Sequence, residues 1–173
     1  MNLDQLAVDK INEQFPDAIE EVRDFRGERT LFVKMAHIKA VCQFLRDDAA
    51  LQYNFISDIC ADDMLPDTPR FAVNYHLISM PNKHRLRLRV RVEDPDNGPE
   101  TVASVWPIAT WLEMEVWDLM GIRFRGNGSL RRLFLPEDWQ GHPLRKDYPL
   151  GYEEVQFTFN REEIDRKKPY AQD

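Results

Sequence analysis

Two acidic residues three positions apart, Glu115 and Asp118, are the first candidates for chemistry in this sequence. This spacing places both carboxylates on one face of a helix, where such a pair can work as general acid and general base. A third acid, Glu113, precedes them, and several arginines follow within forty residues. Because a buried charge is costly without a partner, we expect Glu113, Glu115 and Asp118 to form structural ion pairs with those arginines.

Other residue types that bind metals or act as nucleophiles are scattered along the chain. Cys42 and Cys60 stand far apart without a C-x-x-C pattern, and no two histidines have the spacing of a metal-binding pair. Neither a phosphate-binding loop nor a nucleophile elbow occurs. We therefore expect no catalytic, cofactor-binding or metal-binding residue in this chain. The four histidines are His37, His76, His84 and His142.

The spacing of apolar residues predicts an α+β fold with a mainly antiparallel sheet, flanking helices and an extended C-terminal segment. Apolar residues that follow the helical period predict helices over 3–15, 37–49 and 107–121, the last ending at Gly121. Strands are expected over 18–25, 29–35, 53–64, 70–79 and 84–92. The last three form a meander in the simplest arrangement.

Residues 84–92 alternate between two kinds of side chain. The aliphatic residues fall on one face and Arg85, Arg87, Arg89 and Arg91 on the other. The arginine face is either an anion or partner surface or a solvated face neutralised across strands by acids such as Asp58 and Asp62. Antiparallel sheets commonly have one solvated face of this kind, which favours the second interpretation. A net charge of −7 and the absence of aromatic residues within the stripe count against nucleic-acid binding. A nucleic-acid-binding module that uses the Arg85–Arg91 stripe is the alternative of a different class.

The stretch "GHPLRKDYPLGY", residues 141–152, is highly charged but contains two prolines that exclude a regular helix. It suits a substrate-binding loop, or an extended segment held by its own domain or by a partner. No run of roughly 20 apolar residues that could cross a bilayer is present. Hydrophobic residues at 43% and charged residues at 31% are typical of a globular protein.

Residues 111–152 strongly resemble the signature region of the 30-kDa subunit of the respiratory NADH–quinone oxidoreductase known as complex I. Met114 stands where that family usually has arginine, and Asn127-Gly128 replace its usual His-Pro, a change expected to loosen the turn. The matching positions are Glu113, Glu115, Asp118, Gly121, Ile122, Phe124, Gly126, Leu130, Arg131, Arg132, Leu135, Pro136, Asp138, Trp139 and Gly141–Pro149.

The resemblance implies a non-catalytic structural or assembly subunit in the hydrophilic arm of a proton-translocating NADH–quinone oxidoreductase. Such a subunit lies on the cytoplasmic side of the cell membrane as a peripheral protein. It docks against the large quinone-site subunit and the small iron–sulfur subunits, while iron–sulfur clusters, flavin and quinone belong to partner subunits. An equivalent subunit of a membrane-bound hydrogenase or of a ferredoxin–plastoquinone oxidoreductase is the alternative.

The resemblance also implies one domain over residues 1–152 and a C-terminal tail over 153–173. No nucleic acid is expected as a partner, and membrane association is expected only through the complex. Bulky and charged side chains near the end of the domain are expected to bind partner subunits. These residues are Arg131, Arg132, Trp139, His142, Pro143, Arg145, Lys146, Asp147 and Tyr148.

Overall fold

The computed structural model describes residues 3–149 and 157–167. The three helices and five strands predicted from the sequence occur in the predicted order, with ends that differ by a few residues, and α4, η1 and η2 were not predicted. The elements are α1 (Leu3–Gln14), β1 (Ile19–Phe25), β2 (Glu28–Val33), η1 (Met35–His37), α2 (Ile38–Asp47), β3 (Phe55–Asp63), β4 (Phe71–Ser79), β5 (His84–Val92), η2 (Pro95–Asn97), α3 (Ala109–Met120) and α4 (Arg161–Lys167).

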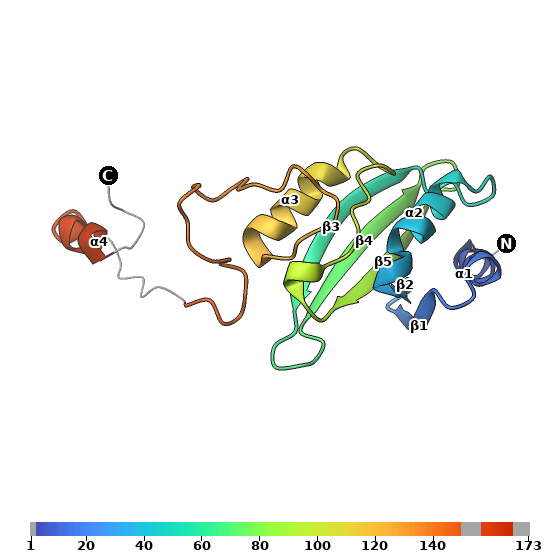
Figure 1. The fold of residues 1–173 in the computed structure, drawn as a ribbon, viewed down its shortest axis with the longest axis horizontal. Coiled ribbons are helices and arrows are strands. Elements are labelled where there is room, and N and C mark those ends of the chain that lie inside the picture. The colour runs from blue at the N-terminus through green and yellow to red at the C-terminus, as the bar shows by residue number, and fades with distance from the viewer. Residues whose placement is uncertain (1–2, 150–156, 168–173) are drawn as a thin grey trace.

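The five strands form one sheet in the order β1-β2-β5-β4-β3 (Figure 1). The predicted meander is confirmed, because β3 pairs antiparallel with β4 and β4 pairs antiparallel with β5. The β1–β2 hairpin turns at Gly27, whose positive φ of 82° suits glycine. The expected mainly antiparallel sheet also contains one parallel pairing, between β2 and β5, which sets Leu31 beside Leu88.

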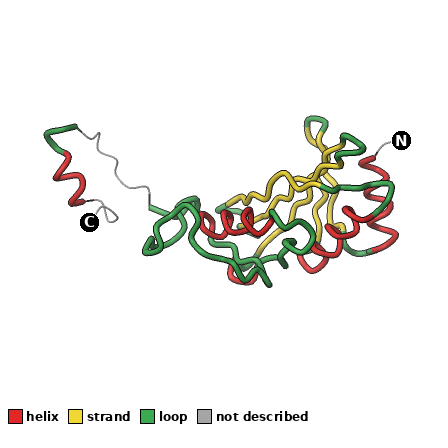
Figure 2. Tube along the Cα trace, turned by 90° about the horizontal axis from the view of Figure 1, so that it is seen from above, coloured by secondary structure: helices red, strands yellow, loops and turns green. Residues whose placement is uncertain are grey.

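Helices α2 and α3 lie on one face of the sheet, as the two views of the chain show (Figures 1 and 2). The apolar side chains of β2, β4 and β5 on this face pack against Ile38, Val41, Cys42 and Leu45 of α2. Helix α1 adds Ile11 to the same core. The hydrophobic core therefore occupies one side of the sheet and leaves the other side to polar residues.

Four arginines of β5 occupy the open face of the sheet, and three of them form ion pairs with acids. Phe32 is buried on this face beneath the guanidinium groups of Arg23 and Arg91, at 4.7 and 4.4 Å from its ring centre. Asp62 pairs with an arginine as predicted, whereas Asp58 lies across from His76 instead. The ion pairs are Arg87 with Glu28, Arg89 with Asp62, and Arg91 with Glu20 and Glu21.

After α3 the chain runs from 121 to 149 without a further helix or strand, as expected for the extended segment (Figure 2). The predicted boundary at residue 152 falls outside the described residues. In the described ranges 3–149 and 157–167, no helix has the length and apolar character needed to cross a bilayer.

Candidate functional site

Helix α3 positions the carboxylates that the sequence singles out. Glu113 is fully buried and accepts hydrogen bonds from Thr101 Oγ1 at 2.6 Å, from the backbone N–H of Val102 at 2.8 Å and from Asn127 Nδ2 at 2.9 Å. Burial raises the pKa of Glu113, although these donors oppose the shift. No arginine of the described residues contributes, so neutral donors take the place of the ion pair expected for Glu113. The Glu113 carboxylate thus connects α3 to the loop before the helix, through Thr101 and Val102, and to the loop after it, through Asn127.

Asp118 is also fully buried and anchors the chain that follows α3. Its Oδ2 accepts the backbone N–H groups of Leu133, Phe134 and Leu135 at 2.8–3.1 Å. Its Oδ1 accepts Arg132 Nη1 at 3.0 Å, the only arginine pair of the three acids within the described residues. Burial alone would raise the pKa of Asp118, but the three backbone donors and Arg132 together lower it.

Glu115 differs from its two neighbours. It is partly exposed, and the described part of the chain gives it no ion pair. The structure therefore does not show the arginine partner expected for this acid. Glu115 and Asp118 do not form a shared acid–base site either, because both Asp118 oxygens are occupied by the donors of residues 132–135.

The segment 141–149 lies against the C-terminal end of α3. His142 Nδ1 donates to the carbonyl oxygen of Asp118 at 2.9 Å. The backbone N–H of Leu144 donates to the carbonyl oxygen of Leu119 at 3.1 Å. Arg145 Nε donates to the carbonyl oxygen of Met120 at 2.7 Å. These contacts satisfy carbonyl groups that a helix end leaves unpaired, and a cation there is favoured by the helix dipole.

Gly121 makes this close contact with the helix end possible. It has a φ of 74° and follows the last residue of α3, as the sequence predicts. A Cβ atom at this position would lie 2.4 Å from Arg145 Nη2 and 2.4 Å from His142 Cδ2. Gly121 is therefore required for two reasons. It adopts the left-handed backbone conformation without strain, and its lack of a side chain lets His142 and Arg145 approach the helix end.

Arg70 connects the segment 141–149 to the loop between β3 and β4. Its guanidinium group pairs with Asp63 at 2.7 Å and with Asp147 at 2.6 Å. The pKa values of both carboxyls are lowered, chiefly by the hydrogen bonds from Arg70. Lys146 adds its backbone N–H to Asp63 and its ammonium group to the carbonyl oxygen of Leu65. The charges of the segment thus have partners inside their own domain.

The remaining residues predicted to bind partners have mixed positions. Trp139 and Pro143 are partly buried, Tyr148 donates to the carbonyl oxygen of Gln140, and Arg131 is exposed. Arg132 also donates to the carbonyl oxygens of Trp139 and Gly141. These hydrogen bonds hold residues 132 and 139–141 together, so that the chain between them forms a loop.

Exposed apolar side chains lie near the start of α3 and on the chain that follows this helix. A groove of about 500 Å³ lies between the start of α3 and residues 128–131, and on the helix side it is lined by Pro107, Thr110, Trp111 and Met114. Trp111 is 50% exposed and Trp117 is only partly buried, so neither ring of this largely apolar helix is fully buried. We use the name apolar face for the exposed apolar residues of α3, of its N-terminal approach and of the segment after the helix, which are Ile108, Trp111, Phe134 and Leu144.

Comparisons with known proteins agree with this structure over most of its length. A family model described as the 30-kDa subunit of the respiratory-chain NADH dehydrogenase matches residues 31–154. The chain belongs to this family. A relative from Roseiflexus sp. (strain RS-1), named as a subunit of NADH-quinone oxidoreductase, is 44% identical over the whole of both chains. A relative of the same name from Geobacter sulfurreducens is 50% identical over 83% of this chain and 88% of its own.

A solved structure shows the same fold. The chain titled Nqo5 of the trypsin-resistant fragment (1-134) is 30% identical, with a TM-score of 0.60 over 73% of this chain and 98% of that one. As a 30-kDa subunit of the NADH dehydrogenase, this protein is a member of an enzyme complex. The names of its relatives make the other subunits of that complex its partners.

Two positions that depart from the usual pattern of the 30-kDa subunit are accounted for locally. Met114 is buried and lines the groove of the apolar face. Asn127, in the turn expected to be loosened, donates to Glu113 and accepts the N–H of Ser129. The turn is therefore fastened by an amide side chain.

Several residues that build the site were missed by sequence reasoning. Thr101 and Asn127 hold Glu113, while Arg70 and Asp63 hold the segment 141–149. Asp63 and Arg70 stand on either side of the proline-containing loop between two predicted strands. This placement was the available sign that the two side chains could pair. The second ion pair of Arg70, with Asp147, depends on tertiary contacts and has no signature in the local sequence.

Proposed function

We propose that this 30-kDa subunit is a non-catalytic docking subunit in the hydrophilic arm of a proton-translocating NADH–quinone oxidoreductase. The apolar face binds the large quinone-site subunit and the small iron–sulfur subunits during electron transfer from NADH to quinone. Iron–sulfur clusters, flavin and quinone reside in those partners, and the chain lies on the cytoplasmic side of the membrane as part of the complex.

The observation that carries the proposal is the combination of exposed apolar side chains with a braced backbone. Phe134 is 64% exposed although its own N–H is bound to Asp118, and Leu144 is 58% exposed although its N–H is bound to Leu119. Apolar side chains held out to solvent on a preorganised backbone are a feature of protein interfaces, because little ordering remains to be done on binding. The ion pairs of the segment therefore support docking indirectly, by fixing this surface.

Two doubly substituted chains test the proposal. Phe134→Asp with Leu144→Asp places two charges on the apolar face, and Phe25→Asp with Met80→Asp does the same at positions of matched exposure elsewhere, 66% and 60%. Both are expected to melt like the parent, because surface changes cost little stability. Only the first should lose co-purifying subunits, by about tenfold or more, since buried apolar anchors dominate interface affinity. Equal recovery of the complex with both variants would refute the proposal.

The nucleic-acid-binding alternative is not favoured by the open face of the sheet. Three of the four guanidinium groups of the β5 stripe are engaged by acids. Binding to phosphates would require these ion pairs to be broken or the acids to be neutralised, which removes the electrostatic gain. The names of the relatives, which are subunits of NADH-quinone oxidoreductases, favour this complex over the hydrogenase and ferredoxin-linked alternatives.

A further inference from the structure

The open face of the sheet brings together three side chains that can bind a metal. Asp58 and Cys60 alternate with the buried Ile59 along β3, so both point to the open face. His76 of β4 is the direct cross-strand neighbour of Asp58. An irregularity in the β3–β4 register between Ile56 and Asp58 sets this alignment. The carboxylate, thiol and imidazole atoms all lie within 4.8 Å of one another.

The distances suit a small tetrahedral ion. Cys60 Sγ lies 3.7 Å from His76 Nε2. With typical zinc bonds to sulfur and nitrogen, a tetrahedral ion holds these two atoms about 3.6 Å apart. Asp58 is exposed, and Cys60 and His76 are partly exposed, so an ion can enter from solvent and keep water as a fourth ligand. A thiolate, an imidazole and a carboxylate form a ligand set that favours zinc over magnesium or calcium.

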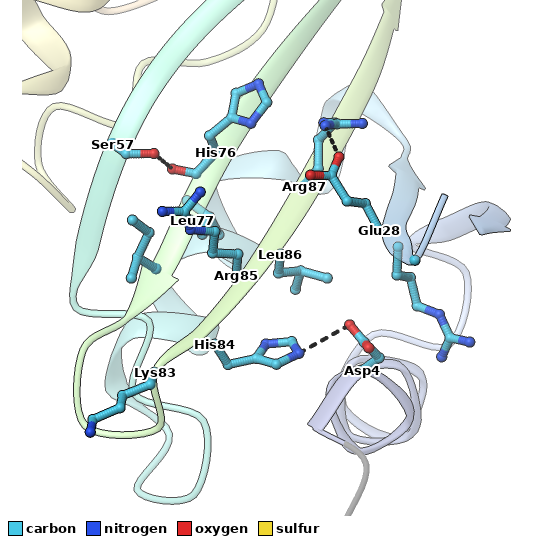
Figure 3. A pocket seen from close by; sticks show the side chains of 13 residues that line it. Asp4, Glu28, Ser57, His76, Leu77, Lys83, His84, Arg85, Leu86 and Arg87 are labelled. Carbon is cyan, nitrogen blue, oxygen red and sulfur yellow. Dashed lines mark hydrogen bonds and ion pairs between the residues drawn. The ribbon is translucent and has the colours of Figure 1, made fainter. Parts of the chain in front are cut away.

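The surrounding charges are already balanced without an ion. Arg87 of β5 lies directly across from His76 and is paired with Glu28 (Figure 3). Asp62 is paired with Arg89. A divalent cation bound by one thiolate, one carboxylate and a neutral imidazole gives a site with no net charge, whereas the metal-free site carries the single negative charge of Asp58. Burial raises the pKa of Cys60, so the free thiol is protonated and must release its proton when the ion binds.

The neighbouring polar groups hold the ligands in place. Ser57 Oγ donates to the backbone carbonyl of His76, as Figure 3 shows. Asn74 of β4 is the direct cross-strand neighbour of Cys60, and its side chain donates to Asp62. These contacts fix the backbone of His76 to the strand that carries Asp58 and Cys60.

We propose that Asp58, Cys60 and His76 form a three-ligand site for a divalent cation of the zinc class on the open face of the sheet. The site is separate from the apolar face, because helix α3 lies on the opposite side of the sheet (Figure 2). The sequence predicted no metal in this chain because Cys60 and His76 stand 16 positions apart. Only the pairing of β3 with β4 brings them together.

Titration of the purified, metal-free full chain with zinc alone tests the site. We expect one zinc ion per chain in calorimetry, with release of about one proton from Cys60. Cobalt, used as a spectroscopic probe, should give a sulfur-to-metal charge-transfer band. Cys60→Ser should abolish the band, and Cys60→Ser and His76→Ala should each weaken zinc binding by more than about tenfold.

Two control variants make the result specific. Cys42→Ala removes the other cysteine, which is buried in the core, and His37→Gln removes a histidine on another element. Both should bind zinc like the parent, and zinc should raise the melting temperature of the parent but not of folded Cys60→Ser. Absence of saturable binding to the parent, or equal binding by Cys60→Ser and His76→Ala, would overturn the proposal.

Discussion

Replacement of Asp118 by asparagine gives the sharpest test of how the segment after α3 is held. The change keeps the shape of the side chain but removes its charge and turns one acceptor into an N–H donor. Because Oδ2 accepts three N–H groups and Oδ1 accepts Arg132, either orientation of the amide points a donor at another donor. The side chain is fully buried, so water cannot compensate.

The magnitude follows from these contacts. Loss of one partner of a buried ion pair costs about 3–5 kcal/mol, mainly because the other charge is stranded. For a domain of this size, that loss lowers the melting temperature by about 6–20 °C. Residues 131–149 should also become more sensitive to protease than in the parent, because their backbone anchor is removed.

The assay compares Asp118→Asn with Glu115→Gln in urea and thermal denaturation. Glu115 lies on the same helix, is partly exposed and has no ion pair within the described residues, so its substitution should change stability by less than about 0.5 kcal/mol. Equal stability of the two variants would refute the anchoring role of Asp118.

The remaining predictions concern pH and the charged segment. The pKa values of Asp63, Asp118 and Asp147 are lowered in the folded chain, so the unfolded chain binds more protons at acidic pH. Stability should therefore be fully present above about pH 5 and decline from about pH 4 downward, and Asp118→Asn should show a shallower decline in denaturation titrations. Joint replacement of Arg145 and Lys146 by alanine should destabilise the isolated chain by about 2 kcal/mol, because hydrogen bonds from charged donors to α3 and Leu65 are lost. An unchanged melt would show that these charges do not brace the domain.

Local patterns were sufficient to predict the five strands and helices α1, α2 and α3, but not α4. The alternation of residues 84–92, the apolar period of α2 and the glycine at 121 each depend on neighbours in sequence, and the structure confirms all three. The parallel pairing of β2 with β5 was not predicted, because nothing within either strand specifies a distant neighbour. It depends on how the connecting segments cross the sheet.

The site was predicted only in part for the same reason. Asp118 does pair with an arginine, but the choice of Arg132 among the nearby arginines is made by the path of residues 131–135. Glu113 meets Thr101 and Asn127 because two loops converge on one turn of α3. Physical reasoning from the sequence indicated that buried acids need partners. It did not indicate that the partners of Glu113 would be neutral hydrogen-bond donors instead of arginines.

The place of β5 in the sheet has a consequence for how the protein is synthesised. Thr30 in β2 pairs with Arg87 in β5, which the ribosome adds 57 positions later. Until then β2 presents an unpaired edge with apolar side chains, among them Leu31 and Val33, and such edges recruit other chains. We expect fragments that end before His84 to aggregate. The N-terminal hairpin and helices can therefore complete their fold only after the middle strand has emerged, which makes this a domain that folds late during translation.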